Sequence, residues 1–242
     1  MSHESSTGVD AEQRPSRGSA RVRWRWLTAG AATVCLVLAA VGWRVWPGHQ
    51  GKSPARLVVG TVQAELLSPQ QASVLAGVSL GPGATSHEPP PAIAAVPSSC
   101  AVAVGPVTRT VYGNGWSAFL SATYQDAEGT GSYTVSQAIG VFPDNGKAAG
   151  ALKVLTDGLG RCPSSSRTDG AGRTSKWAYK TYEPTPVAVA WTATQDGGGG
   201  WACYRQARLK GPALLQVAVC EAGDGQAVAS KIADGFAGKV SG

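Results

Sequence analysis

Two cysteines near the C-terminus offer the clearest chemistry in this sequence, because thiols at the right separation oxidise to a disulfide. Cys203 and Cys220 lie in strand-like runs on either side of Gly211-Pro212, whose residue types suit the centre of a type II′ hairpin turn. In that hairpin the numbers of facing residues add up to 423, so Cys203 faces Cys220. Their Cα atoms would be about 4.5–5.5 Å apart, which predicts a disulfide and an oxidising compartment.

Two further cysteines, Cys100 and Cys162, are expected to form a second disulfide. Four cysteines allow three connectivities, and the hairpin register selects the one that leaves this pair. The bond would tie the first expected strand to the end of a helix. A zinc site is disfavoured, because no two cysteines have C-x₂-C spacing and the ordered part of the domain offers no histidine to complete a site.

No catalytic arrangement is visible in the sequence. The histidines, His3, His49 and His87, lie in a tail, a tether and a proline-rich loop, so none is available for a Ser-His-Asp or Cys-His arrangement. The remaining candidates for catalysis are carboxylates, and any two of them could form a glycosidase pair. Most of them stand beside glycines in turns, so they are better explained as solvated caps. These carboxylates are Asp126, Glu128, Asp144, Asp157, Glu183 and Asp196. We therefore expect no enzymatic activity, cofactor or metal.

Ligand recognition is the remaining role for side chains on the expected strands. Aromatic rings there would stack on a sugar or lipid, and arginines would hold an anion, so we expect an unidentified small-molecule, lipid or glycan ligand. The candidates are Trp177, Tyr179, Trp191, Tyr204, Arg205 and Arg208. The alternative is that the aromatics belong to the core and the arginines are solvated. Arg205 and Arg208 lie on opposite faces of one strand, and the pattern leaves open which face is the core.

The net charge of +6 does not indicate a nucleic-acid partner. Residues 1–56 contain eight Lys or Arg against three Asp or Glu, whereas the rest of the sequence contains thirteen against twelve. The basic character therefore belongs to the N-terminal segment, and the domain that follows is almost neutral. We expect no binding to DNA or RNA.

An uncharged run of eighteen residues, Trp26–Trp43, divides the sequence. As a helix it would be about 27 Å long, close to the thickness of a hydrocarbon core, with tryptophans at both ends. Arginines cluster before it, which predicts residues 1–25 as a cytoplasmic tail and the C-terminal part outside the membrane. The alternative is a cleavable signal peptide, but the long polar segment before the run favours a single-pass signal anchor in the cell membrane. Residues 44–63 would form a tether.

Residues 64–242 are expected to form an α+β domain, an antiparallel sheet with about three helices packed on one face and two disulfides. Helices are predicted after the N-cap Ser68, from a start within Pro143–Gly146 to Gly160, and after the cap Asp224. Strands are predicted over residues 116–125, 133–142, 174–182, 187–194 and 201–210, in the second arm of the hairpin, and from Cys100 to Val104. Residues 78–99 and 163–172 are expected to be loops, and Asn114-Gly115 a hairpin turn.

Four stretches together resemble a known family. They are ELLSPQQASVLAG, the Tyr112–Trp116 turn, VSQAIGVFPDNGKAAGAL and the hairpin that ends at Cys220. In this order, and with four cysteines, they resemble the PknH-type extracellular sensor domain over about Glu65 to Val240. The resemblance implies an α+β fold with two disulfides and a cleft that binds an unidentified ligand. It does not extend to the kinase, for which residues 1–25 are too short.

Two functions fit these observations. The first is a membrane-anchored extracytoplasmic sensor-like domain that binds a cell-envelope ligand without chemistry. The second is a structural or adaptor subunit that docks on a membrane or envelope protein. A large apolar cleft would favour the first function, and a flat apolar patch near the tether would favour the second.

Overall fold

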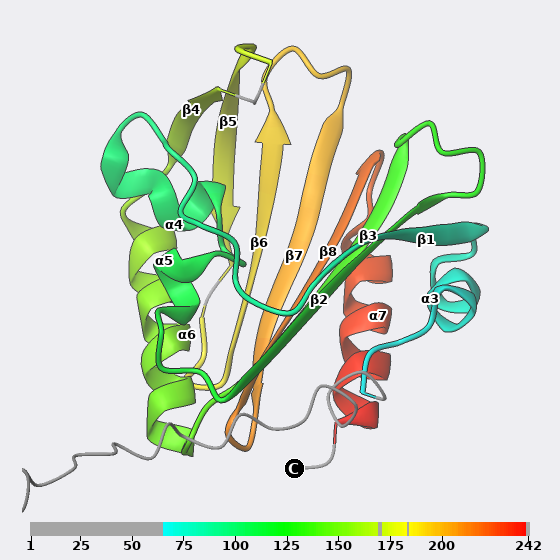
Figure 1. Cartoon of the computed structure of the whole chain (residues 1–242). Helices are drawn as coiled ribbons and strands as arrows, with labels where there is room; N and C mark the ends of the chain where they lie inside the picture. Colours follow the sequence, from blue (N-terminus) through cyan, green and yellow to red (C-terminus); the bar gives the residue numbers. More distant parts are fainter. Residues whose placement is uncertain (1–64, 169–170, 183, 241–242) are drawn as a thin grey trace, which may run out of the picture. The chain divides into compact units, whose positions relative to one another are not determined.

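Eight strands form one antiparallel sheet in the part of the chain that the computed structural model describes, residues 65–168, 171–182 and 184–240 (Figure 1). The order across the sheet is β1-β2-β3-β8-β7-β6-β5-β4. Strand β8 therefore lies between β1–β3 on one side and β4–β7 on the other, although it follows all of them in the sequence. The strands are β1 (Leu80–Ser86), β2 (Ala118–Asp126), β3 (Tyr133–Val141), β4 (Ser164–Thr168), β5 (Thr174–Thr181), β6 (Ala188–Gln195), β7 (Trp201–Lys210) and β8 (Ala213–Ala222).

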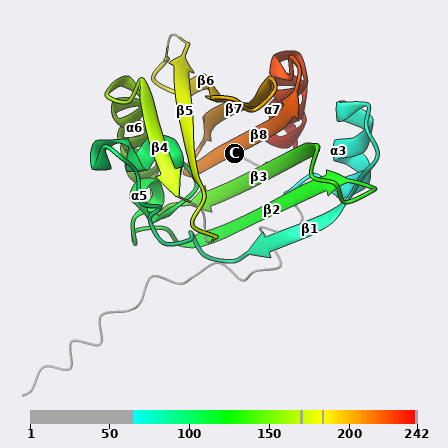
Figure 2. The ribbon, with the colours of Figure 1, turned by 90° about the horizontal axis from the view of Figure 1, so that it is seen from above.

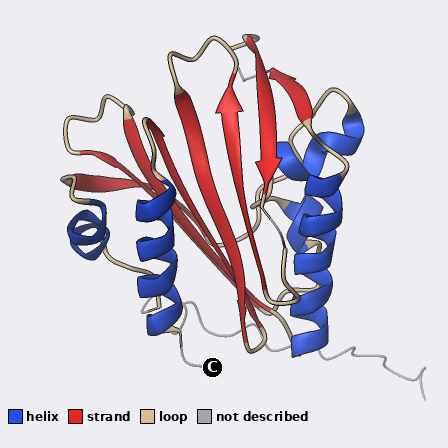
Figure 3. Ribbon diagram, turned by 180° about the vertical axis from the view of Figure 1, so that it is seen from behind, coloured by secondary structure: helices blue, strands red, loops and turns tan. Residues whose placement is uncertain are grey.

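Helices cover both faces of this sheet, and the expectation of about three helices on one face was wrong. The described residues contain α3 (Pro69–Ala76), α4 (Ala101–Val104), α5 (Arg109–Tyr112), α6 (Asn145–Gly160) and α7 (Gln226–Lys239), with a 3₁₀ turn at Ser98–Cys100. Helices α3 and α7 share one hydrophobic core with the sheet, and α4, α5 and α6 share another. Figures 1 and 3 show α6 and α7 on opposite sides of the sheet.

The burial pattern of β8 explains the two helical layers. Leu215 and Val217 contact the core that contains α7, whereas Leu214 between them contacts the core that contains α6. Successive side chains of a strand point to opposite faces, so this strand is covered on both. All residues from 213 to 220 are buried, and apart from Gln216 they are apolar without alternation, as expected of a strand covered on both faces.

The predicted hairpin is confirmed. Cys203 pairs with Cys220 in the β7–β8 ladder, and Lys210 pairs with Ala213 beside the turn. Gly211 has a φ of 55°, the positive value that the first central position of a type II′ turn requires. The Cys203–Cys220 disulfide joins Cα atoms 4.0 Å apart, and the second bond, Cys100–Cys162, joins Cα atoms 5.2 Å apart.

The three predicted helices are present with caps close to those expected. Ser68 caps α3 in a capping box with Gln71, and Asp144 caps α6 through the backbone N–H of Lys147. At α7 the N-cap residue is Gly225, and Asp224 accepts a hydrogen bond from the backbone N–H of Gln226 instead. The predicted caps Ser68 and Asp224 therefore located the starts of α3 and α7 to within one residue, and α6 begins within the predicted stretch Pro143–Gly146.

The run after Cys100 was predicted as a strand and is a helix, α4. Val102 and Ala103 are buried against α6, where Gly158 leaves the space. A Cβ at Gly158 would lie 2.6 Å from the Val102 side chain, so the close approach of the two helices depends on that glycine. Alternating alanine and valine suit a strand and a helix alike, and packing decides between them.

Other local predictions were also wrong. Strands β1 and β4 occupy parts of the segments expected to be loops, because sheet edges pair through the backbone and tolerate their glycine, proline and serine residues. The Asn114-Gly115 turn does not join two paired strands. It follows α5, whose N-cap is Thr108 and whose C-cap is Gly113 with a φ of 58°.

The sheet is strongly twisted, and seen from above β4 and β5 cross the direction of β1, β2 and β3 (Figure 2). The predicted tail (1–25), membrane span (26–43) and tether (44–63) lie outside the described residues. Within the described ranges, no helix is long and apolar enough to cross a membrane.

Candidate functional site

One face of the sheet is covered by α6 over only part of its area. Near the β7–β8 turn, Ala207 and Leu214 pack in the core under α6. Farther along the same two strands, Arg205, Ala218 and Cys220 line two cavities instead. Each cavity has a volume of 230 Å³, and both are lined by Arg205 and Cys220. We call this pair of adjoining cavities the Arg205 groove.

The first cavity of the groove is lined by hydroxyl groups. Thr123 on β2, Ser136 on β3, Ala218 on β8 and Arg205 on β7 form one row across the sheet, because each is paired in register with the next. The Oγ atoms of Thr123 and Ser136 share a hydrogen bond of 3.0 Å. Ser121 adds a third hydroxyl to the lining. This half of the groove therefore offers uncharged hydroxyls among apolar residues, with Arg205 as its charged group.

The second cavity is lined by aromatic rings and the disulfide. Trp177 is 6% exposed and packs against Cys203 and Cys220. The guanidinium of Arg167 lies 4.6 Å from the centroid of the Trp177 ring, a cation–π contact. The Tyr179 hydroxyl shares a hydrogen bond of 2.9 Å with Oγ of Ser165. These interactions fix the aromatic wall before any ligand arrives.

Arg205 is a partly buried residue whose guanidinium Nε has no partner. Its Nε is buried and has no hydrogen-bond partner, and no ion pair within the described part of the chain includes it. Burial lowers the pKa of Arg205 to about 10; the nearby Tyr179 raises this pKa and the charge on Arg167 lowers it. Because the pKa is still well above neutral, Arg205 is positively charged where water solvates it poorly.

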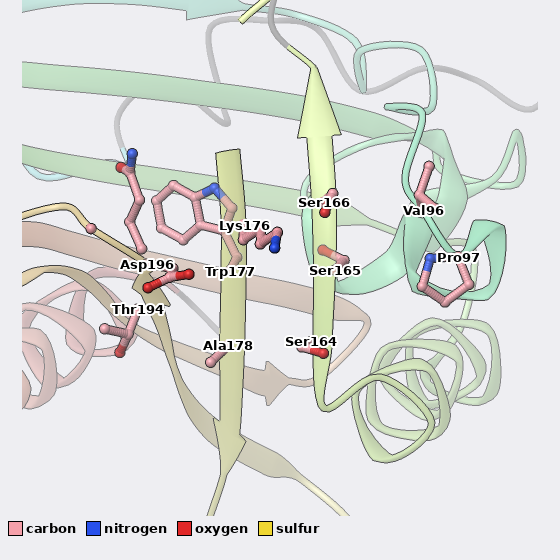
Figure 4. A pocket seen from close by; sticks show the side chains of 12 residues that line it. Val96, Pro97, Ser164, Ser165, Ser166, Lys176, Trp177, Ala178, Thr194 and Asp196 are labelled. Atoms are coloured by element: carbon pink, nitrogen blue, oxygen red, sulfur yellow. The ribbon is translucent and has the colours of Figure 1, made fainter. Parts of the chain in front are cut away.

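A larger hollow of 620 Å³ lies beside the groove, over β4, β5 and β6. Figure 4 shows its lining, with Ser165 and Ser166 on β4, Trp177 on β5, and Asp196 beyond β6. Trp177 lines both this hollow and the second cavity of the groove. Trp177 therefore borders both spaces.

The structure brings together three of the six candidate ligand-binding residues, Trp177, Tyr179 and Arg205, which line the second cavity of the groove. It places Trp191 elsewhere: this side chain is fully buried in the core that contains α6. Trp191 therefore has a structural role and no access to a ligand.

The last two candidates, Tyr204 and Arg208, lie on the other face of β7. The Tyr204 hydroxyl donates a hydrogen bond to the backbone oxygen of Gly223. Arg208 forms an ion pair with Asp234 of α7 and donates to Gln206. Both side chains are therefore engaged in holding α7 and the loop before it.

Several groove residues were missed from the sequence, namely Arg167, Ser121, Thr123 and Ser136. A signal for the hydroxyl residues exists, because Ser121, Thr123 and Ser136 alternate with buried apolar residues along β2 and β3. Arg167 lies in a segment expected to be a loop, so its place on a strand could not be foreseen.

The groove has the chemistry of a binding site. Its described lining residues contain arginines, hydroxyls and aromatic rings, and its two cysteines are joined to each other. Across the described residues, no group of three or more His, Cys, Asp or Glu side chains is placed to hold a metal ion. The arrangement can position a ligand by hydrogen bonds, charge and stacking.

Comparison with known proteins identifies the family. Residues 57–239 match the sequence profile of the family described as PknH-like extracellular domain. The chain belongs to this family. An extracellular domain family agrees with an extracytoplasmic location for this part of the chain.

Similar proteins include the serine/threonine-protein kinases PknH of Mycobacterium bovis and Mycobacterium tuberculosis. Each is 26% identical to this chain over 202 residues, which cover 80% of this chain and 34% or 32% of the kinase. The chain therefore matches about a third of the length of these relatives. The crystal structure of the extracellular domain of PknH from Mycobacterium tuberculosis superposes with a TM-score of 0.65 at 22% identity, covering 76% of this chain and 98% of that one. This likeness supports the fold of the PknH-like domain.

Proposed function

We propose that this protein is a membrane-anchored, extracytoplasmic sensor-like protein that binds a cell-envelope ligand in the Arg205 groove and catalyses no reaction. The observation that supports binding most directly is the part of the sheet face that α6 does not cover, where two adjoining cavities are lined by residues of seven strands, β2 to β8. A rigid sheet with a disulfide in its surface keeps such a groove formed without a ligand. The predicted helix Trp26–Trp43 would hold the domain at the membrane.

Binding without chemistry is favoured by the residue types in the groove. General acid–base and nucleophilic catalysis need a titratable group or nucleophile near its working pKa. The described lining offers hydroxyls with no histidine beside them, and arginines that stay charged. The kinase activity in the names of the relatives is not part of this proposal, because the matched region is about a third of their length.

The adaptor function has weaker support. A docking surface for a protein partner normally includes a contiguous apolar patch. The most exposed large apolar side chains of the described residues come from separate elements, with Val74 on α3, Val96 in the loop before α4 and Val187 before β6. Single exposed side chains of this kind are ordinary on soluble surfaces.

The experiment that tests the groove is native mass spectrometry of the full chain, purified in detergent from its own envelope. We expect a bound small molecule or lipid whose occupancy falls in Ala218→Phe, since Ala218 lies in the groove floor between Arg205 and Ser136. Ala149→Phe, on the exposed side of α6, is the matched control and should keep the ligand. Ser136→Phe is a second groove variant, to be used if Ala218→Phe does not fold. Equal occupancy in the groove and control variants would overturn the proposal.

A further inference from the structure

We propose that the ligand of the Arg205 groove contains an anionic oxygen group, a carboxylate or a phosphate, that Arg205 binds. This inference rests on the proposed function and names the ligand chemistry recognised at the same groove. The argument has four parts: the missing counter-charge of Arg205, the excess of positive charge in the lining, the hydroxyl donors opposite, and the size of the cavities.

The first part is a comparison between two arginines on one strand. Arg208 is paired with Asp234 and hydrogen-bonded to Gln206. Arg205, three residues earlier on the opposite face, has a buried Nε with no partner and no ion pair among the described residues. Buried charges in proteins are normally paired and hydrogen-bonded, because desolvating them is costly. An anionic ligand would supply the missing partner.

The second part is the balance of charge around the groove. The described lining of the two cavities includes two arginines, Arg205 and Arg167, and no carboxylate. The two guanidinium groups are close enough for Arg167 to disfavour the charge on Arg205. This repulsion is unfavourable in the empty groove, and an anion bound beside both groups would relieve it.

The third part is the set of hydrogen-bond donors that face Arg205. Thr123 and Ser136 lie in the same row of the sheet, and their Oγ atoms share one hydrogen bond of 3.0 Å. One hydroxyl proton of this pair is therefore free to be donated to a ligand. The amide of Gln216 is already used, because it donates to Tyr112 and to the backbone oxygen of Pro106. A guanidinium and a hydroxyl donor together suit an oxyanion.

The fourth part is size. Each cavity has a volume of 230 Å³, which is below the range of about 300–1,000 Å³ typical of sites for drug-sized molecules. The hydroxyl cavity therefore suits a small head group. The aromatic cavity, with Trp177 and Trp201, offers an apolar surface on which the rest of the ligand would lie.

The test is thermal unfolding of the full chain in detergent, with inorganic phosphate or malonate compared with chloride at equal ionic strength. We expect the oxyanions to raise the melting temperature of the wild type. Arg205→Gln should abolish this shift, with an affinity at least about tenfold lower, because it removes charge-assisted hydrogen bonds. Arg208→Gln, an arginine on the opposite face of the same strand, should retain the shift. In chloride Arg205→Gln should melt no lower than the wild type, because an unpaired buried charge has been removed.

Two soluble short-chain lipids distinguish the source of the anion. Dihexanoyl phosphatidylglycerol has an anionic phosphate head group, and dihexanoyl phosphatidylcholine has the same acyl chains with no net charge. A shift from phosphatidylglycerol that exceeds the shift from inorganic phosphate would support a lipid head group. A shift from phosphate or malonate alone would support a soluble anion. No shift from any of these anions, or a shift that persists in Arg205→Gln, would overturn the proposal.

The anion inference and the proposed function fail differently. A co-purified ligand that is lost from Ala218→Phe but bound equally by the wild type and Arg205→Gln would preserve the groove and overturn the role of Arg205. A ligand retained by Ala218→Phe would overturn the groove itself. Arg205→Lys keeps one positive charge but cannot form the paired hydrogen bonds of a guanidinium, so it should bind the anion with intermediate affinity. This variant replaces Arg205→Gln in the test if Arg205→Gln does not fold.

Discussion

The side-chain amide of Gln137 forms two hydrogen bonds with the backbone of Leu67. Its Oε1 accepts from the Leu67 N–H at 3.1 Å, and its Nε2 donates to the Leu67 carbonyl oxygen at 3.1 Å. The Tyr124 hydroxyl donates to the same carbonyl at 2.7 Å. Gln137 is 1% exposed and points to the face opposite the Arg205 groove. This contact attaches the segment before α3 to the centre of the sheet.

Gln137→Leu is expected to lower the free energy of unfolding by about 1–3 kcal/mol. The change leaves the Leu67 N–H buried without a partner, so no hydrogen bond compensates for the loss of its contacts with water. Urea unfolding should show a lower midpoint with an unchanged m-value. Gln125→Leu, at an exposed position of β2, is the control and should change stability by less than about 0.5 kcal/mol. Equal losses in both variants would contradict the role of the amide.

Gly140→Ala is expected to destabilise the domain by about 1–3 kcal/mol through overpacking. A Cβ at Gly140 would press on the ring of Tyr112, which is 2% exposed and packs edge-on against Phe119. Gly150→Ala on α6 is the matched control, since a Cβ there meets nothing within 4 Å. It should raise stability by about 0.5–1 kcal/mol, because glycine inside a helix is unfavourable. Thermal unfolding of both variants tests the contrast, and destabilisation by Gly150→Ala would refute it.

Loss of the Cys100–Cys162 disulfide should lower stability more than loss of Cys203–Cys220. The sequence separations are 62 and 17 residues, and loop-closure entropy alone assigns about 4 and about 3 kcal/mol as upper figures. The comparison is between the Cys100→Ala/Cys162→Ala and Cys203→Ala/Cys220→Ala double variants, by melting temperature. Peptide mapping without reduction should recover only these two pairs, and a Cys100–Cys203 peptide would contradict the β7–β8 register.

Stability is expected to fall between pH 10 and about 12 as Tyr133 ionises. Burial, with a smaller effect from the charge of Glu221, raises the pKa of Tyr133 from 10.0 to about 12. A raised pKa means that the folded state keeps a proton that the unfolded state loses, so the stabilisation present below pH 10 disappears through this window. Tyr133→Phe should show a smaller fall with pH in urea unfolding. Parallel curves for the variant and the wild type would exclude Tyr133 as the cause.

Protease added to intact spheroplasts should remove the domain that begins near residue 64 and leave an epitope tag at the N-terminus protected. The arginines before Trp26–Trp43 predict this orientation. Lysed spheroplasts are the control, in which the protease should digest both regions. Digestion of the tag in intact spheroplasts would reverse the predicted topology.

Elements with local signals were predicted well from the sequence. The Gly211-Pro212 turn sets the register of its own hairpin, so Cys203 and Cys220 could be paired without knowledge of the rest of the fold. Helix α3 carries its start in Ser68 and Pro69 and its end in Gly77. In these cases the deciding contacts lie within a few residues of each other.

Elements decided by distant contacts were not predicted. The helix after Cys100 depends on Gly158, more than fifty residues later, which makes room for Val102. The same limit applies to the site. Trp191 and Arg205 are cross-strand neighbours on one face, yet Trp191 is buried under α6 and Arg205 lines the groove. Their environments differ because α6 and its neighbours cover the sheet above Trp191 but not above Arg205. The sequence pattern of a single strand does not predict how far a distant helix extends over it.

The position of β8 has a consequence for when the groove comes into existence. Strands β1–β3 and β4–β7 have no common hydrogen-bonded edge, and only β8, the last strand of the chain, joins them. Thr123 and Ser136 come from the first group, whereas Arg205 and Trp177 come from the second. The two walls therefore remain separate until β8 has been made and has paired with both groups. A chain truncated after Lys210 would contain Arg205, Thr123 and Ser136 but not the strand that joins them, so it would lack the proposed binding groove.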